Sequence, residues 1–466
     1  MPDDEFRIER DSRGELRIPV DALWGPQTQR AVENFGLGGI VMPPAFIHAL
    51  ALVKWAAATA NGELGQLAPG RAAAIAEAAL EVAAGHHDRQ FPVDVFQTGS
   101  ATSTNMNANE VIASLAARRL GQPEHPNDDV NRGQSSNDTI PTALHVAAAR
   151  ALAERVLPAL EHLAAVLAER IASDGHVLKT ARTHLMDAVP MSLGQELGAW
   201  RSQVLDSSAR LQSVLPRLLR LAQGGTAVGT GLNAPAGFGE AVAAGLAERT
   251  GLAFVPAPDR FAAIAAQDTA VELSGQLRGA AVVLTKIAND LRWMNSGPLA
   301  GLGEVALPEL QPGSSIMPGK VNPVIPEAVA MAAVAVVGND AAIALAGQSG
   351  SFQLNTMLPL MAHLLLQSET LVANSATALA DRAIAGMTVQ PERLAAALAH
   401  NPMLVTALNP LIGYDRAAAI ARAARAQGRP ILEVAVEMSG LPRDELARLL
   451  DPARLARGPQ RDAPDE

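Results

Sequence analysis

The residues best suited to chemistry lie in the segment Gly313–Pro323, GSSIMPGKVNP. This segment offers two adjacent hydroxyls, a flexible cation and a side-chain amide, carried by Ser314, Ser315, Lys320 and Asn322. Its glycines and prolines predict a loop between two long helices, and loops on rigid scaffolds often hold catalytic groups. A turn with incidental serines is the ordinary alternative. A phosphate-binding loop is excluded, because Val321 follows Gly319-Lys320 and the upstream glycine spacing is absent.

Two further segments gather small polar side chains. They contain Ser100 and Thr102 on either side of Ala101, and Ser135, Ser136 and Asn137 in a row. Hydroxyl and amide groups can bind the carboxylates of a short diacid without adding net charge. The alternative is helix capping, since Ser and Asn commonly precede helices. Both interpretations can hold together, because helix N-termini also bind anions.

Histidines and glycines suggest three other sites. His184 in Thr183-His184 can titrate near neutrality, although one histidine among 10 is more often structural. The pair His86-His87 predicts a helix end rather than a metal site, since adjacent residues cannot face one point on a helix. Gly224–Asn233 resembles a dinucleotide fingerprint only superficially, because we expect it between helices rather than after a strand. We therefore expect neither a metal nor a cofactor.

Composition favours helices as the elements that position these groups. The chain has 466 residues, which favours two or three domains. Hydrophobic residues make up 48% of it, but aromatic residues only 3%. Strands favour aromatic and β-branched side chains, whereas this chain is rich in Ala and Leu, which favour helices. An all-α fold follows.

Charge and sequence context restrict the partners. The formal net charge of -10 argues against nucleic acid or an anionic membrane as partner. A dianionic substrate would then need a locally positive site. With 0 Cys, disulfides and thiol catalysis are excluded. The acidic N-terminus does not resemble a signal peptide, and no uninterrupted apolar run spans a bilayer. We expect a cytoplasmic protein.

The helical pattern predicts three domains. Short helices and loops occupy residues 1–134, beginning with a hairpin arm around Asp11–Gly14. Residues 135–386 carry very long helical segments with apolar residues at spacings of three and four, as in a bundle. Residues 387–466 return to short helices. The long segments have too much apolar surface for one subunit, which predicts an oligomer.

The segment GSSIMPGKVNP resembles the signature loop of the fumarase/aspartase superfamily. Five more segments resemble other parts of that family in the same order: Ala22–Arg30, Thr98–Glu110, His125–Asp138, Arg182–Glu196 and Leu404–Asp415. The resemblance implies a three-domain, all-α fold whose central bundle forms the core of a homotetramer. It also implies a cofactor-free lyase in which each active site draws residues from three subunits.

The resemblance assigns roles to the residues. Ser314, six positions before Lys320, is the base that takes a carbon-bound proton, and His184 is oriented by Glu327. Lys320 supports catalysis and also binds substrate. The other implied substrate-binding residues are Ser100, Ala101, Thr102, Ser135, Ser136, Asn137, Thr183, Ser315 and Asn322. A second, non-catalytic dicarboxylate site is implied at His125, Pro126, Asn127 and Asp128, although Gln122 stands where several relatives carry arginine.

Within the superfamily, the details favour class II fumarases. Ser135-Ser136-Asn137 resembles fumarases, whereas aspartases usually show Ser-Thr-Asn; Val324–Glu327 resembles the aspartase continuation. Ala101 and Thr104 depart from the commoner glycine and serine. The expected activity is reversible hydration of fumarate to L-malate, a step of the tricarboxylic acid cycle, through an aci-carboxylate intermediate. The alternatives are aspartate ammonia-lyase and a non-catalytic scaffold.

Overall fold

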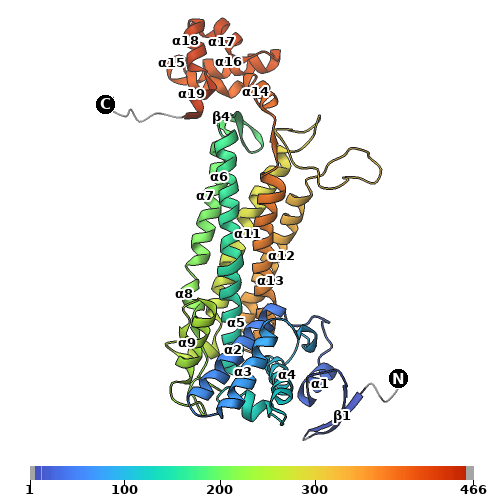
Figure 1. The fold of residues 1–466 in the computed structure, drawn as a ribbon. Helices are drawn as coiled ribbons and strands as arrows, with labels where there is room; N and C mark the ends of the chain where they lie inside the picture. The colour runs from blue at the N-terminus through green and yellow to red at the C-terminus, as the bar shows by residue number, and fades with distance from the viewer. Residues whose placement is uncertain (1–5, 12, 458–466) are drawn as a thin grey trace. The chain divides into compact units, whose positions relative to one another are not determined.

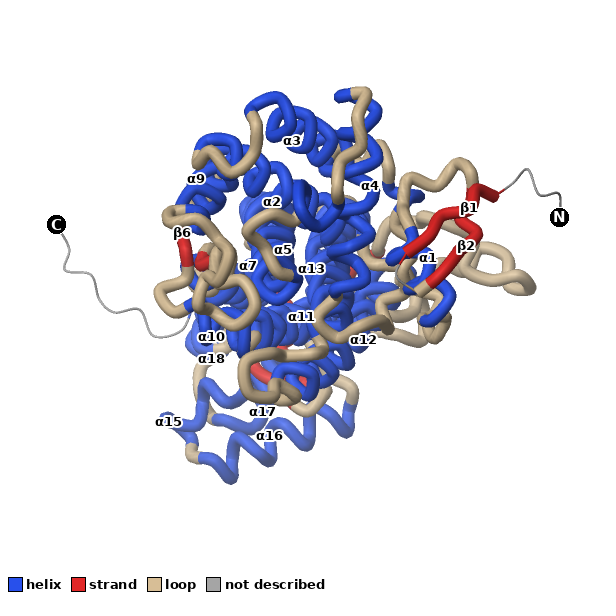
Figure 2. Tube along the Cα trace, turned by 90° about the horizontal axis from the view of Figure 1, so that it is seen from below, coloured by secondary structure: helices blue, strands red, loops and turns tan. Residues whose placement is uncertain are grey.

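A computed structural model describes residues 6–11 and 13–457 of the chain (Figure 1). Helices dominate these residues, and strands are confined to short two-stranded sheets (Figure 2). The all-α prediction is confirmed. The chain forms two compact units, the first made of Met1–Pro158, Ser207–Ala281 and Ala332–Ala373. The second comprises Ala159–Asp206, Val282–Met331 and Asn374–Glu466. The three predicted domain boundaries stay a prediction.

The first unit begins with the predicted hairpin arm, β1 (Phe6–Asp11) paired antiparallel with β2 (Gly14–Pro19). The helices that lie wholly in this unit include α1 (Pro26–Asn34), α2 (Pro44–Glu63), α3 (Pro69–Ala83), α4 (Thr102–Leu120), α5 (Ser136–Ala151) and α9 (Phe238–Thr250). Proline stands at the start of α1, α2 and α3, where its missing N–H costs nothing. The almost wholly apolar α2 packs against α3, α5 and α9, which explains why most of its residues are buried.

Five long helices contribute residues to both units. They are α6 (Leu157–Asp174), α7 (Leu193–Gln212), α11 (Asp268–Met294), α12 (Val324–Gly347) and α13 (Leu358–Leu379). The longest, α11, has 27 residues and measures about 40 Å at 1.5 Å per residue. The apolar pattern predicts that this helix begins near Phe261. The structure instead breaks it at Ala266, whose extended backbone ends α10 (Arg260–Ala265).

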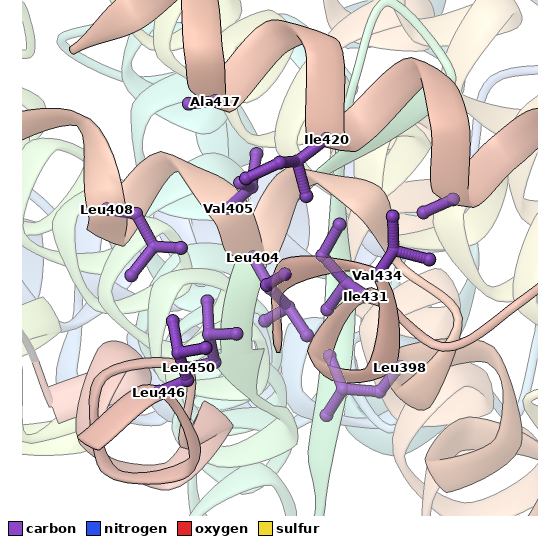
Figure 3. Packing of buried hydrophobic residues seen from close by; sticks show 12 residues of the cluster. Leu398, Leu404, Val405, Leu408, Ala417, Ile420, Ile431, Val434, Leu446 and Leu450 are labelled. Atoms are coloured by element: carbon purple, nitrogen blue, oxygen red, sulfur yellow. The ribbon is translucent and has the colours of Figure 1, made fainter. Parts of the chain in front are cut away.

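The second unit contains a hairpin and the C-terminal helices. Strands β3 (Leu178–Thr183) and β4 (Met186–Ser192) form the hairpin, which the residue pattern does not predict. Helices α14 (Pro391–Ala399), α16 (Tyr414–Gln427), α17 (Ile431–Ser439) and α18 (Arg443–Leu449) share one apolar core (Figure 3). Leu404, Ile420 and Val434 lie at its centre, drawn from segments that are each too short to be stable alone.

One helix of the described residues, α12, is long and apolar enough to cross a membrane, with a mean hydropathy of 1.9. Core helices of soluble proteins pass the same test. The polar Asp340 in this helix accepts hydrogen bonds from Ser274 (2.8 Å) and Arg278 (2.7 Å) of α11. These bonds fit a helix that packs against protein.

Candidate functional site

The segment Gly313–Pro323 is a loop, as predicted, and it leads into α12. Hydrogen bonds close its neck: Gly313 N–H donates to the carbonyl of Lys320 at 2.9 Å, and Asn322 Nδ2 donates to the carbonyl of Gly313 at 2.6 Å. A Cβ at position 313 would lie 2.2 Å from the carbonyl oxygen of Lys320, so only glycine fits there. Gly319 adopts φ +75°, which also favours glycine. Sequence thus shapes the loop through these two glycines.

Ser314 and Ser315 differ in their surroundings. Ser314 Oγ accepts hydrogen bonds from the backbone N–H groups of Ile316 (3.2 Å) and Met317 (3.1 Å). Ser314 is half-buried, whereas Ser315 is exposed. Two N–H donors on one hydroxyl oxygen stabilise negative charge on that oxygen. The geometry therefore favours Ser314 as the serine whose alkoxide the loop can support.

Two adjoining cavities hold the remaining predicted residues of this loop. Ser314 and Lys320 line one of about 490 Å³. Lys320, Asn322 and Glu327 line another of about 400 Å³, together with Arg292 near the end of α11. Lys320 is exposed and so free to reach a ligand in either cavity. The loop and the start of α12 thus place a hydroxyl, an ammonium, an amide and a carboxylate around two cavities whose linings share Lys320.

His184 lies at the tip of the β3–β4 hairpin. Thr183 pairs with Met186, so His184 and Leu185 form a two-residue turn. Their φ angles are +57° and +60°, which is typical of a type I′ turn. Both residues and Thr183 are exposed, and no hydrogen bond joins His184 to Glu327 or Ser314 within the described chain. The single subunit therefore presents His184 outward, without the predicted carboxylate partner.

A buried ion network, not anticipated from sequence, anchors the base of this hairpin. Glu304 accepts hydrogen bonds from Lys179 (2.8 Å) and Arg182 (2.5 Å), and Lys179 also bonds Glu196 at 2.5 Å. Burial alone would raise the pKa of Glu304, but the Arg182 hydrogen bond and the Lys179 charge hold that pKa below its ordinary value. The matched charges fix the strand that ends at Thr183, next to His184. The two cations in the run KTAR are the one sequence signal of this network.

In the first unit, the starts of two helices meet through hydroxyl groups. Thr102, the first residue of α4, hydrogen-bonds Ser136, the first residue of α5, at 2.8 Å. Ser100 bonds Thr102 at 2.7 Å. We call Ser100, Thr102 and Ser136 the hydroxyl cluster. The positive ends of both helix dipoles point toward it, which favours an anion.

Neighbouring residues hold the hydroxyl cluster in place. Ala101 caps α4 with φ +54°, a left-handed conformation that suits glycine better and accounts for the glycine more usual in the family. Thr104, the other departure, donates to Gln97 through its N–H (3.0 Å) and its hydroxyl (2.8 Å). Neither residue disrupts the bonds among the three hydroxyls.

Ser135 and Asn137 join this region to a distant loop. Ser135 Oγ accepts from the Asn137 N–H at 3.2 Å, so the capping alternative holds for Ser135. Asn137 Nδ2 donates to the carbonyl of Ala227 at 2.9 Å. Ala227 belongs to the predicted Gly224–Asn233 loop. The two-residue strand β5 (Arg220–Leu221) precedes that loop, contrary to expectation, but α9 begins only at Phe238, so the dinucleotide interpretation still fails.

The predicted second site forms one compact turn. His125 caps the short helix Pro126–Val130, its Nδ1 accepting from the Asp128 N–H at 3.0 Å. Its exposed side-chain groups belong to His125, Asn127 and Asp128. The nearby Arg71 already pairs with Glu124 (2.9 Å) and Asp129 (3.0 Å). The exposed Arg132 contacts the turn, its guanidinium donating to the carbonyl of Asp128 at 3.4 Å. Binding at this turn stays a prediction.

The described residues contain no cluster of side chains suited to hold a metal ion. Within residues 6–11 and 13–457, no group of three or more His, Cys, Asp or Glu is arranged to hold a metal ion. His87 bonds Glu81 at 3.1 Å, and His48 bonds Asp88 at 2.8 Å, as surface ion pairs. These pairs agree with the helix-end interpretation of His86-His87.

Each unit, taken by itself, offers groups that suit a carboxylate ligand. The hydroxyl cluster offers neutral donors at two helix N-termini, suited to a carboxylate. The Gly313–Pro323 loop offers a serine with backbone support, an ammonium and an amide, suited to a base and to a developing oxyanion. The hairpin offers a titratable imidazole. This set fits proton removal beside a carboxylate.

Comparisons with known proteins point to one family. A family model described as lyase matches residues 14–338, and a model described as fumarase C C-terminus matches residues 404–457. Together they cover most of the chain, including every predicted site residue.

Individual relatives agree over nearly their whole length. A protein of Xylella fastidiosa named fumarate hydratase class II is 58% identical over 455 residues, covering 98% of this chain and 96% of the relative. A protein of the same name from Mycobacterium tuberculosis is 52% identical over 464 residues, covering 98% of both. The crystal structure of a class II fumarase from Schistosoma mansoni matches with a TM-score of 0.93 and 38% identity, covering 97% of this chain and 99% of that one.

Proposed function

This chain belongs to the class II fumarase family of lyases, and we infer that it is a fumarate hydratase, which interconverts fumarate and L-malate. It is a hydro-lyase: it breaks a carbon–oxygen bond and releases water in one direction, and adds water in the other. The proton leaves a carbon next to a carboxylate, so the intermediate is a doubly charged aci-carboxylate. Such a species survives only where donors and positive charge face the carboxylate.

The observation that carries the mechanism is the pair of backbone N–H groups on Ser314 Oγ. A neutral serine is a weak base, and these donors lower the cost of its alkoxide. Ser314 then takes the proton from carbon. Lys320 and Asn322, which line the adjoining cavity, stabilise the charge that develops on the substrate carboxylate.

The other groups bind and protonate. Hydroxyls of Ser100, Thr102 and Ser136, with Ser135 and Asn137 beside them, hold a substrate carboxylate without adding charge. His184 activates the incoming water, or protonates the departing hydroxide, with Glu327 from another subunit orienting it. Thr183 and Ser315 supply further binding hydroxyls.

The exposed apolar face of α12 supports a homotetramer. Met331 is 69% exposed and Val334 72% exposed in the single chain, and Leu345 is 62% exposed. Only 28% of the most apolar 18-residue stretch of α12 is buried in the single chain. Isolated apolar helix faces of this size need a partner, and copies of the same helix supply one. A site shared between subunits also explains why His184 points outward without a carboxylate.

Turnover of two substrates tests the function. Purified protein should form fumarate, followed by its ultraviolet absorbance, far faster from L-malate than from L-aspartate. Added chelator should leave the rate unchanged, because no step uses a metal. Faster ammonia release from L-aspartate would instead establish aspartate ammonia-lyase, which the Val324–Glu327 segment also resembles. No turnover of either substrate would favour a scaffold. Cytoplasmic location stays a prediction.

A further inference from the structure

Lys54 is a buried ammonium without a carboxylate partner. It lies in α2, and its side chain is 0% exposed. Its Nζ donates to Asn131 Oδ1 at 2.9 Å and to Gln134 Oε1 at 3.0 Å, and both acceptors are neutral amides. Burying a charge is costly unless an opposite charge compensates it. Packing alone would favour an apolar residue at this position, so the charge of Lys54 indicates a functional role.

The ammonium is linked through hydrogen bonds to the segments that carry the hydroxyl cluster. Gln134 precedes Ser135 in the chain and so fixes the approach to α5. Asn131 Oδ1 also accepts from Asn105 Nδ2 at 3.2 Å, and the Asn105 N–H bonds the carbonyl of Ala101 at 2.9 Å. Lys54 is therefore connected by hydrogen bonds to both segments that carry the hydroxyls. Its charge adds to the two helix dipoles at the same place.

Asp138 is the buried acid whose negative charge acts on Lys54. Its carboxylate is 0% exposed and accepts from the N–H of Ser135 (2.9 Å), Gly224 (3.0 Å) and Thr226 (2.9 Å), and from Gln223 at 3.1 Å. Burial raises the pKa of Asp138 to about 6, against these bonds. Burial likewise lowers the pKa of Lys54 to about 7, against the attraction of Asp138. Both groups therefore change charge near neutral pH.

Most other charged groups on the elements packed around α2 are engaged elsewhere, and Glu63, Arg118, Arg132 and Glu248 are exposed. On α4, Glu110 accepts backbone N–H groups of Gly25, Gln27 and Thr28, and on α5, His145 bonds the carbonyl of Arg220. Further charged groups on α2, α3, α4, α5, α9 and the turn after His125 form ion pairs or stack on a ring. These pairs are His48 with Asp88, Arg71 with Glu124 and Asp129, Arg119 with Glu77 and Glu81, Arg150 with Glu154, Arg260 with Glu240, and Arg249 over the Trp55 ring.

We propose that Lys54 is the buried cation of the dicarboxylate site, and that a dianion bound at the hydroxyl cluster draws a proton onto the Lys54–Asp138 pair. The inference rests on the proposed function in taking that cluster as a substrate-binding region. The Lys54 ammonium supplies the local positive charge that a protein of net charge -10 needs to attract a dianion. Lys54 touches no substrate and is a positioning residue, acting through Asn131 and Gln134.

The sign of the coupling follows from the charges. A nearby dianion favours charged Lys54 and neutral Asp138, so binding raises the pKa of both groups and takes up protons. Affinity for the dianion therefore falls as pH rises through about 7, the pKa of Lys54 in the ligand-free protein. A neutral lysine above that pH no longer helps to hold the ligand.

Calorimetry with succinate, a saturated four-carbon diacid that cannot react, measures the proton uptake directly. Binding heats in two buffers of different ionisation enthalpy give the number of protons at about pH 7.5. We expect the unaltered protein to take up roughly half to one proton. Lys54→Met, which keeps the shape, should lose most of that uptake. It should also raise KM for L-malate about tenfold, the effect of one partly screened charge, while kcat changes less.

A second variant avoids altering the buried lysine. Gln134→Glu places a carboxylate on half-buried Gln134, within reach of Lys54, and should hold Lys54 charged at all pH values near neutrality. Proton uptake should then fall by the share that Lys54 contributes, and affinity for succinate should weaken. If Lys54 only held its two amide partners in place, Lys54→Met would lower stability and leave the uptake of the folded enzyme unchanged.

Three results would overturn the inference: no proton uptake by the unaltered protein, full uptake by Lys54→Met, or full uptake by Gln134→Glu. Fumarate formation from L-malate, measured on the same preparation, separates this inference from the proposed function. Normal turnover without proton uptake removes only the role of Lys54, whereas absent turnover removes the fumarase assignment itself.

Discussion

The hydroxyl cluster and the Gly313–Pro323 loop handle their polar groups in opposite ways. In the hydroxyl cluster, each hydroxyl bonds another protein group, and Lys54 and Asp138 lie buried close by. In the loop, Ser315 and Lys320 are exposed, and the neighbouring Ile316 is 82% exposed. One region is prearranged by its own chain, and the other offers reactive groups to open space.

This difference teaches where the chain can complete a site by itself. Helix N-termini, the bonds among the hydroxyls and the amide bonds of buried Lys54 hold binding groups in place before any ligand arrives, which limits the ordering cost of binding. The loop and the His184 hairpin have exposed apolar residues beside them, Ile316 in one and Leu185 in the other. Such surfaces suit completion by other copies of the chain.

Ser314→Ala should give the largest effect and tests the loop side of the comparison. Removing the base should lower kcat by more than about 10³, while KM changes little because the binding groups remain. Steady-state kinetics with L-malate measures both constants. Ser315→Ala is the matched control and should retain much more turnover. The reverse ranking would show that Ser315 is the base.

Lys320→Ala should follow in size. Loss of one well-placed donor to a developing oxyanion costs about 10²–10³ in rate, and a charged donor lies at or above that range. Because Lys320 also binds the ground-state carboxylate, KM should rise while kcat falls. A variant with unchanged kcat and raised KM would limit Lys320 to binding and leave the oxyanion to other donors.

Thr102→Val tests the prearranged region. It removes the hydroxyl that bridges Ser100 and Ser136 but keeps the side-chain shape. Two lost hydrogen bonds in a binding region should raise KM about tenfold, with a smaller change in kcat. The next residue, Ser103, bonds Thr98 instead at 3.1 Å, so Ser103→Ala is the control and should change KM little. Equal effects of both changes would mean that the cluster does not bind substrate.

Ala101→Gly should give the smallest effect, on stability. The left-handed backbone at position 101 strains alanine, and glycine relieves that strain. Glycine also loses more conformational entropy on folding, which offsets part of the gain. We expect the free energy of unfolding to rise by less than about 1 kcal/mol in denaturant titrations. Ala108→Gly, in the middle of the same helix, is the control and should lower it by about 1 kcal/mol or more. A loss of stability in Ala101→Gly would contradict the strain.

Sequence was sufficient for the helical fold, and it singled out the candidate segments of the site, whose roles stay predictions. Long apolar periodicities identify α11, α12 and α13, and the residue types of Gly313–Pro323 indicate its chemistry without reference to its geometry. The residue pattern predicts the start of α4 too late, after Asn107. The run TSTNMNANE has poor helix formers, and the helix begins there because buried Asn105, Asn107 and the left-handed Ala101 fix it through tertiary packing.

Long-range contacts could not be predicted from sequence. Asp138 meets groups 85 to 88 positions later in the chain, and no local pattern signals that return. Lys179 and Glu304 in the buried ion network are 125 positions apart. Lys54 did leave a signal, since it is the one charged residue in the run ALALVKWAAA. A lone charge on an otherwise buried helix is a functional candidate by the cost of its burial.

Mixing two inactive variants tests most directly the central claim that the active site forms between subunits. The His184→Asn and Ser314→Ala proteins should each be nearly inactive. After subunit exchange at equal amounts, a site is intact when its His184 comes from a Ser314→Ala chain and its Ser314 from a His184→Asn chain. Random assembly gives this in about a quarter of sites.

Exchange should therefore recover about a quarter of the unaltered activity. Mixing His184→Asn with the double variant His184→Asn/Ser314→Ala is the control and should recover none. Exchange itself is verified by mass spectrometry of differently labelled chains. No recovery in the first mixture, despite proven exchange, would show that His184 and Ser314 of one chain serve the same site and would contradict a site shared between subunits.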